Sequence, residues 1–88
     1  MEALDLMLRN NLEVKKCFFT YMQAEGALPP RVDVRFQLET DGSVSSANIT
    51  QAKYAGTDLD RCLRSAVMGI TFPPTSRSSK ITYPFIFQ

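Results

Sequence analysis

The most constraining feature of the sequence is the strict alternation between Arg31 and Glu39. Charged or amide side chains alternate there with apolar ones, which are Val32, Val34, Phe36 and Leu38. A period of two predicts a strand with one dry face and one wet face. Asp41-Gly42 then predicts a hairpin turn, since glycine accepts a positive φ at no steric cost. The chain is therefore expected to fold around a sheet that is covered on one face only.

Two further strands are expected. The return strand should run from Val44 to about Ala52, with a bulge or a twisted stretch, because its apolar phase slips between Val44 and Ala47-Ile49. The last strand should run from Lys80 to Phe87, and its inward face should carry Ile81, Tyr83, Phe85 and Phe87. Pro84 has no N–H group, which places this strand at an edge of the sheet.

Two amphipathic helices flank the hairpin. The first is expected from about Leu4 to Ala24, with a break near Asn10, where Asn10 and Glu13 can form a capping box. The second begins after Thr57, a good N-cap residue, with Asp60 as a weaker form of the capping box. Phe72-Pro73-Pro74 is expected to end it.

These elements predict a two-layer α+β sandwich in the order α-β-β-α-β. An antiparallel three-stranded sheet in the order 2-1-3 keeps the alternating strand central, and both helices cover one of its faces. Residues 1–88 are too few for a second core and form a single domain. The core between sheet and helices is expected to contain Phe18, Val34, Phe36, Leu38, Leu63, Tyr83 and Phe85.

Composition argues against an enzyme. The chain has no histidine and no cluster of glycines, so we expect no catalytic base, no metal and no cofactor. Ser76, Ser78 and Ser79 lie near Lys80 but lack an acidic or histidine partner, and a polar loop explains them better. Ten basic against nine acidic residues argue against a nucleic acid partner. No apolar stretch is long enough to insert into a membrane.

The two cysteines, Cys17 and Cys62, are 45 residues apart, a spacing that fits neither a zinc site nor a redox pair. Two buried free thiols are one reading. On a helical projection, however, each cysteine lies on the flank of its helix, where it would meet the neighbouring helix. We therefore expect a disulfide, which would stabilise the fold by roughly 4 kcal/mol and implies an oxidising compartment, the periplasm or the cell exterior.

Six short motifs along the chain resemble those of a known family. The motifs are Val14-Lys-Lys-Cys17-Phe18, Val32-Asp-Val-Arg-Phe36, Asp41-Gly42-Ser-Val44, Leu59-Asp-Arg-Cys62, Phe72-Pro73-Pro74 and Tyr83-Pro-Phe-Ile-Phe87. Together they resemble the C-terminal domain of TonB-type energy transducers, whose architecture TolA shares. Within that family the chain most resembles the myxobacterial AgmX/GltJ-like branch of gliding-motility proteins. Phe18-Phe19 stands where a tyrosine is more typical, Pro29-Pro30 replaces a common glycine, and the loop after Phe72-Pro73 is serine-rich rather than glycine-rich.

The resemblance implies a domain of a longer protein that is anchored in the inner membrane and reaches across the periplasm. Its partner would be an outer-membrane or periplasmic protein, engaged in transmitting force for gliding motility or TonB/Tol-like transport. In TonB the partner contributes a short strand to the edge formed by the last strand, which here contains Thr82, Tyr83, Pro84, Phe85, Ile86 and Phe87. An unpaired strand edge is in any case a template for strand addition. The alternative is a structural scaffold module of a cell-envelope complex, or a homodimer formed through this edge.

Overall fold

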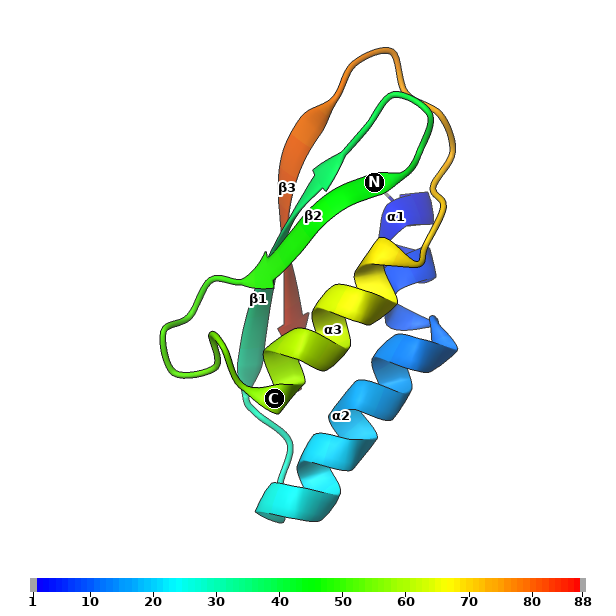
Figure 1. Ribbon diagram of the computed structural model, residues 1–88. Coiled ribbons are helices and arrows are strands. Elements are labelled where there is room, and N and C mark those ends of the chain that lie inside the picture. Colours follow the sequence, from blue (N-terminus) through cyan, green and yellow to red (C-terminus); the bar gives the residue numbers. More distant parts are fainter. Residues whose placement is uncertain (1, 88) are drawn as a thin grey trace.

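The sheet has the predicted strand order. The computed structural model describes residues 2–87 and places β1 (Arg31–Leu38) between β2 (Val44–Ile49) and β3 (Ser79–Ile86). Both outer strands run antiparallel to β1. Three helices accompany them: α1 (Glu2–Arg9), α2 (Leu12–Glu25) and α3 (Asp58–Met68) (Figure 1). The α+β class and the 2-1-3 order are thus confirmed.

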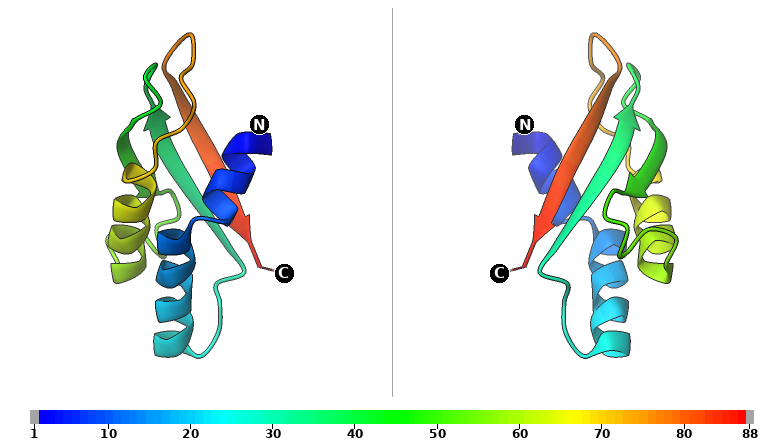
Figure 2. Two further views of the ribbon diagram at one scale, coloured as in Figure 1. Left: turned by 90° about the vertical axis from the view of Figure 1, so that its right-hand side faces the viewer. Right: turned by 90° about the vertical axis from the view of Figure 1, so that its left-hand side faces the viewer.

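The molecule has two layers. The apolar side chains of β1 are buried and the intervening ones reach solvent, because the helices cover only one face of the sheet. Figure 2 shows the sheet and its helices from two opposite sides, with α1 crossing in front of β3 in one view and behind it in the other. The expected break near Asn10 is present, so the first predicted helix covers the sheet as two separate segments, α1 and α2.

The break lies at Asn10 and Asn11, and its cap differs from the prediction. The side chain of Asn11, not of Asn10, accepts a hydrogen bond from the backbone N–H of Val14 at 3.0 Å. Asn11 is thus the N-cap of α2, since its side chain satisfies a first-turn N–H group that has no partner within the helix. The α2 helix ends at Glu25, and Gly26 follows with a φ of +83°.

The expected bulge in β2 is present. Gln37 pairs with Ser46 and Leu38 with Val44, so Ser45 is the extra residue. The bulge corrects the slip in the apolar phase, because it lets Val44 face the core together with Ala47 and Ile49.

The β2 strand ends at Ile49, earlier than the predicted Ala52, because a side chain continues the pairing. Thr50 still donates its N–H to the carbonyl of Asp33 at 3.0 Å. The amide of Gln51 then accepts from the N–H of Asp33 at 2.8 Å and donates to the carbonyl of Arg31 at 3.2 Å. These two hydrogen bonds replace ones that backbone groups of a longer β2 would have made to β1. The backbone after Thr50 can therefore leave the sheet and turn toward α3.

The end of α3 also differs from the prediction. The helix stops at Met68, before Phe72-Pro73-Pro74, and Phe72 instead enters the core. Its ring stacks on that of Phe36, with centroids 5.8 Å apart, and its N–H donates to the carbonyl of Gly42 at 2.8 Å. Gly42 has a φ of +90°, and a Cβ there would overlap the carbonyl of Phe72. The hairpin turn and the segment before β3 can therefore approach closely only because residue 42 is glycine.

The core lies between the sheet and the helices, largely as predicted. Six of the seven expected residues are buried, namely Phe18, Val34, Phe36, Leu38, Leu63 and Phe85. Tyr83 is only half-buried, because it lies on the edge strand, where the short helix α1 gives incomplete cover.

Candidate interaction edge and cross-linked helix pair

The six residues predicted to bind a partner lie together along the outer strand. Thr82 to Ile86 belong to β3, and Phe87 follows it and donates its N–H to the carbonyl of Pro30 at 3.0 Å. Because the strand order is β2-β1-β3, one side of β3 pairs with β1 and the other side faces away from the sheet. The sequence thus located a sheet edge correctly.

The pairing register shows which backbone groups point outward. Asp33 lies opposite Pro84, and its own N–H and C=O are directed away from β3, where they bond to Gln51 and Thr50, the two residues that follow β2. In an antiparallel ladder, opposite residues alternate between pairs that share hydrogen bonds and pairs that do not, and Asp33 and Pro84 form a pair that does not. The backbone N and C=O of Pro84 therefore point away from β1, toward the outer side of β3. By the same alternation, Thr82 and Ile86 direct their N–H and C=O groups outward, while Tyr83 and Phe85 bond to β1. Pro84 therefore leaves the ladder with β1 intact and removes one donor from the free edge.

The side chains of β3 divide between the two faces of the sheet. Phe85 is buried, and Phe18 of α2 packs against both Phe85 and Phe87, with ring centroids 5.2 and 4.7 Å apart. Ile86 lies out of phase with these rings and is 58% exposed on the wet face. An apolar side chain therefore lies next to the outward backbone groups of the edge.

The α1 helix is held over β3 by a polar contact that sequence reasoning missed. The hydroxyl of Tyr83 donates to the carboxylate of Asp5, which also pairs with Arg9 at 3.1 Å. Burial raises the pKa of Tyr83 to about 12, and the hydrogen bond and negative charge of Asp5 act in the same direction. The helical spacing of Asp5 and Arg9 was readable as an ion pair, but nothing in the sequence linked Asp5 to a tyrosine 78 residues later.

This contact predicts a loss of stability at alkaline pH. The pKa of Tyr83 is raised from about 10 in the unfolded chain to about 12 in the fold. Its contribution is therefore complete below pH ~10 and decreases as the pH rises toward ~12. Urea unfolding across this range should show a larger loss for the wild type than for Tyr83→Phe. Parallel curves for the two proteins would contradict the contact.

The predicted cross-link between the helices is confirmed. The sulfur atoms of Cys17 and Cys62 are bonded, and the two Cα atoms are 5.7 Å apart. Cys17 is buried, whereas Cys62 is exposed on the flank of α3. The bond ties α2 to α3 within the helical layer.

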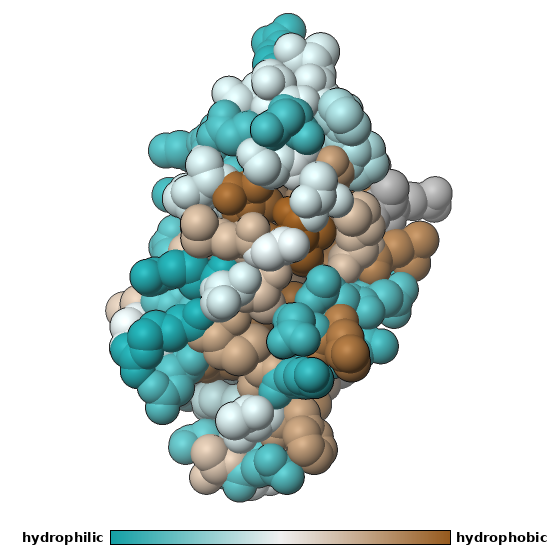
Figure 3. All heavy atoms as spheres, turned by 45° about the vertical axis from the view of Figure 1, so that its right-hand side comes forward, coloured by the Kyte–Doolittle hydropathy of each residue, from teal (hydrophilic) through white to brown (hydrophobic). Residues whose placement is uncertain are grey.

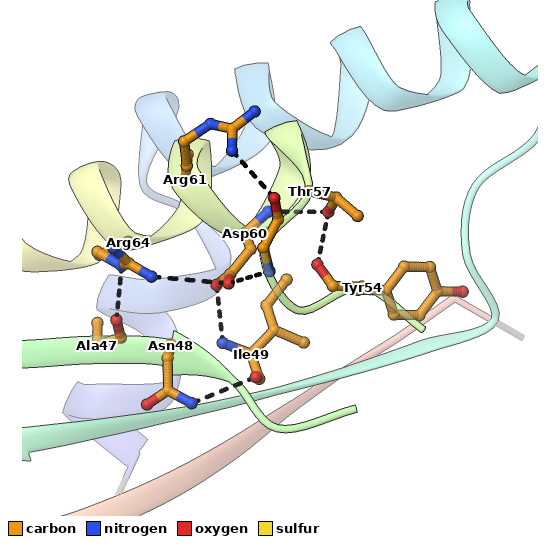
Figure 4. Close-up of polar contacts among 9 residues, drawn as sticks. Ala47, Asn48, Ile49, Tyr54, Thr57, Asp60, Arg61 and Arg64 are labelled. Atoms are coloured by element: carbon orange, nitrogen blue, oxygen red, sulfur yellow. Dashed lines mark hydrogen bonds and ion pairs between the residues drawn. The ribbon is translucent and has the colours of Figure 1, made fainter. Parts of the chain in front are cut away.

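A buried carboxylate ties α3 to the sheet (Figure 4). Asp60 is 2% exposed, and it accepts hydrogen bonds from the N–H of Ile49 at 2.9 Å and of Gly56 at 2.8 Å. Arg64 lies 3.7 Å from the same carboxylate and donates to the carbonyl of Ala47 at 3.1 Å. Asp60 was expected to act within its own capping box, but its partners lie before the N-cap and in β2. These satisfied bonds indicate a structural role.

Several apolar side chains of the helices are exposed to solvent. Figure 3 shows brown, apolar atoms in several patches separated by hydrophilic ones. Phe19 and Leu12 of α2 are 54% and 63% exposed. Scattered apolar residues of this kind are normal on a protein surface, so they mark no docking site by themselves.

The described part of the chain offers neither a metal cluster nor a membrane-spanning helix. Within residues 2–87, no three His, Cys, Asp or Glu side chains lie close enough together to hold a metal ion. Over the same residues, no helix has both the length and the apolar character needed to cross a membrane.

The fold and the edge define a class: a small two-layer α+β domain with disulfide-linked helices and an unpaired outer strand. Comparison adds no relative to this description, because no family model, curated protein or solved structure matches the chain.

Proposed function

We propose that the protein is a periplasmic protein-binding domain of an inner-membrane-anchored protein that transmits force, in gliding motility or TonB/Tol-like transport. Its partner would be an outer-membrane or periplasmic protein that adds a strand to β3. The proposal rests on the family resemblance together with one structural observation, the outward-facing backbone of β3 at Thr82 and Ile86. The disulfide supports an oxidising compartment, since such bonds persist there and are rare in the cytosol.

Strand addition would use both features of this edge. The outward N–H and C=O groups of Thr82 and Ile86 would supply affinity through backbone hydrogen bonds, and Pro84 would contribute only its carbonyl. Ile86 would supply selectivity, because its exposed side chain would pack against an apolar side chain of the added strand.

Ile86→Asp is expected to weaken partner binding by about tenfold or more, because a charge would replace the apolar contact beside the added strand. The free energy of unfolding should change by only about 0.5 kcal/mol, since the side chain is largely exposed. Calorimetric titration with the partner and urea unfolding of each variant measure the two effects.

Ser46→Asp is the matched control, because Ser46 is exposed on the opposite edge strand, β2, and the charge change is the same. It should bind the partner like the wild type. A folded Ile86→Asp variant with full affinity would contradict binding at β3, and equal losses in both variants would indicate a general effect of charge.

The second candidate function is a structural scaffold or a strand-exchange dimer formed through the same edge. An antiparallel pair of two β3 strands is possible in principle, because each offers outward groups at Thr82 and Ile86. Such a pair would include two copies of Pro84 and lose two hydrogen bonds, whereas a partner strand loses one. Light scattering separates the two functions, since a dimer that Ile86→Asp dissociates would favour the second.

A further inference from the structure

A pocket of about 370 Å³ opens between α2 and α3, away from the edge strand. Its lining comes from these two helices and from the segment that joins β2 to α3, and includes no residue of β3. Cys17 and Leu59 lie at its buried side, since they are 3% and 4% exposed. The volume falls within the range of ligand pockets, roughly 300–1,000 Å³. Because no residue of β3 lines it, this pocket is a different site from the β3 edge of the proposed function.

The aromatic lining of the pocket comes from two tyrosine rings. Tyr21 of α2 and Tyr54 of the joining segment meet edge to face, with centroids 6.1 Å apart. Tyr54 is buried, while Tyr21 is half-exposed, so part of its ring can contact a ligand. The face of an aromatic ring carries partial negative charge and attracts a cation.

Glu25 favours a cation beside the rings, whereas Lys53 brings a positive charge to the same lining. Glu25 lies one turn after Tyr21 on the same side of α2, and α2 ends there with no basic residue in its last turn. The negative end of the helix dipole adds to the charge of Glu25. Within residues 2–87, Glu25 takes part in no ion pair, whereas Asp58 at the same pocket is paired with Arg61. Burial raises the pKa of Tyr21 most, followed by the effect of Tyr54 and then by the negative charge of Glu25.

The chain itself places a cation on one of these rings. The ammonium nitrogen of Lys53 lies 5.5 Å from the centroid of the Tyr54 ring, and the exposed Lys53 side chain lines the pocket. An ammonium on an aliphatic stem thus already occupies the aromatic wall beside Tyr21. A second cation that entered the pocket would compete with it.

We propose that this pocket binds an arginine or lysine side chain of a partner protein, with the cation over the Tyr21 ring and next to Glu25. The aliphatic stem of that side chain would lie along the apolar wall formed by Leu59 and the disulfide. Arginine is the better fit, because a planar guanidinium stacks on aromatic rings and is more weakly hydrated than an ammonium.

The test is an NMR titration of the ¹⁵N-labelled full chain with acetyl-Gly-Arg-Gly-amide, its lysine analogue and a leucine control. The arginine tripeptide should bind most tightly and should shift amide signals of residues 20–25 and 53–59. The lysine tripeptide should bind the same site more weakly. Added salt should weaken both, since the contact is partly electrostatic and exposed.

Two variants with opposite expected effects sharpen the test. Glu25→Gln should weaken arginine binding about two- to fivefold, and Lys53→Met should strengthen it by a similar factor, because it removes the competing cation. Glu13→Gln is the matched control, since it removes the same charge from α2 outside this pocket. Ile86→Asp should also bind the tripeptide like the wild type, which keeps this result independent of the β3 edge.

Several outcomes would overturn the proposal. Equal affinity for the leucine and arginine tripeptides would show an apolar pocket with no preference for a cation. Absence of shifts at residues 20–25 and 53–59 would show that the pocket binds neither side chain. Equal effects of Glu25→Gln and Glu13→Gln would show attraction to overall charge rather than to this site.

Discussion

Reduction of the Cys17–Cys62 disulfide is expected to lower the free energy of unfolding by about 4 kcal/mol. The bond joins residues 45 positions apart, and closing a loop of this length removes much of the conformational entropy of the unfolded chain. Whole domains have a stability of about 5–15 kcal/mol. The loss is therefore expected to leave a domain of 88 residues close to unfolding.

Urea unfolding of the oxidised and the fully reduced wild type isolates this effect, because the two proteins differ only in the bond. The change in stability should be accompanied by a larger slope with urea for the reduced form, whose unfolded state is more expanded. Reduced and oxidised proteins that unfold at the same urea concentration would contradict the prediction.

Phe36→Ala is expected to destabilise the protein by about 3–5 kcal/mol. Phe36 is 1% exposed on the central strand, and its ring stacks on Phe72. Truncation would leave a cavity between β1 and the segment before β3, which is fixed by the bond from Phe72 to Gly42 and so cannot close over it.

Thermal and urea unfolding measure this effect, with Phe19→Ala as the matched control. Phe19 is 54% exposed on α2, so its truncation should cost about 0.5 kcal/mol or less. Phe36→Leu keeps most of the volume and should cost less than about 1.5 kcal/mol, which preserves a measurable protein if the alanine variant does not fold. A Phe36→Ala protein as stable as Phe19→Ala would place Phe36 outside the core.

The fold was predictable because local patterns determine most of it. The period of two in β1 and the missing N–H of Pro84 were enough to order the three strands. What could not be predicted depends on contacts between distant residues. The side chain of Gln51 replaces the end of β2 by bonding to Asp33 and Arg31, which lie 18 and 20 residues earlier in the chain.

The candidate sites show the same division. The β3 edge and the cysteine pair follow from residue type and helical phase, which a sequence displays directly. The pocket beside Tyr21 was missed, because Tyr54 lies in a turn segment without periodicity and its burial depends on α2. The acidic end of α2 was a readable signal, but the sequence did not show that an aromatic ring lies next to it.

The disulfide also determines how far the chain can be drawn out from its ends. Eighty-eight fully extended residues have a contour length of about 300 Å. The Cys17–Cys62 bond bypasses the 44 residues between the two cysteines and shortens that length to about 150 Å. The bypassed loop contains β1 and β2, whereas α1 and β3 lie outside it. Tension applied to the termini would therefore peel β3 away from β1 while the hairpin itself carries no load through its own backbone.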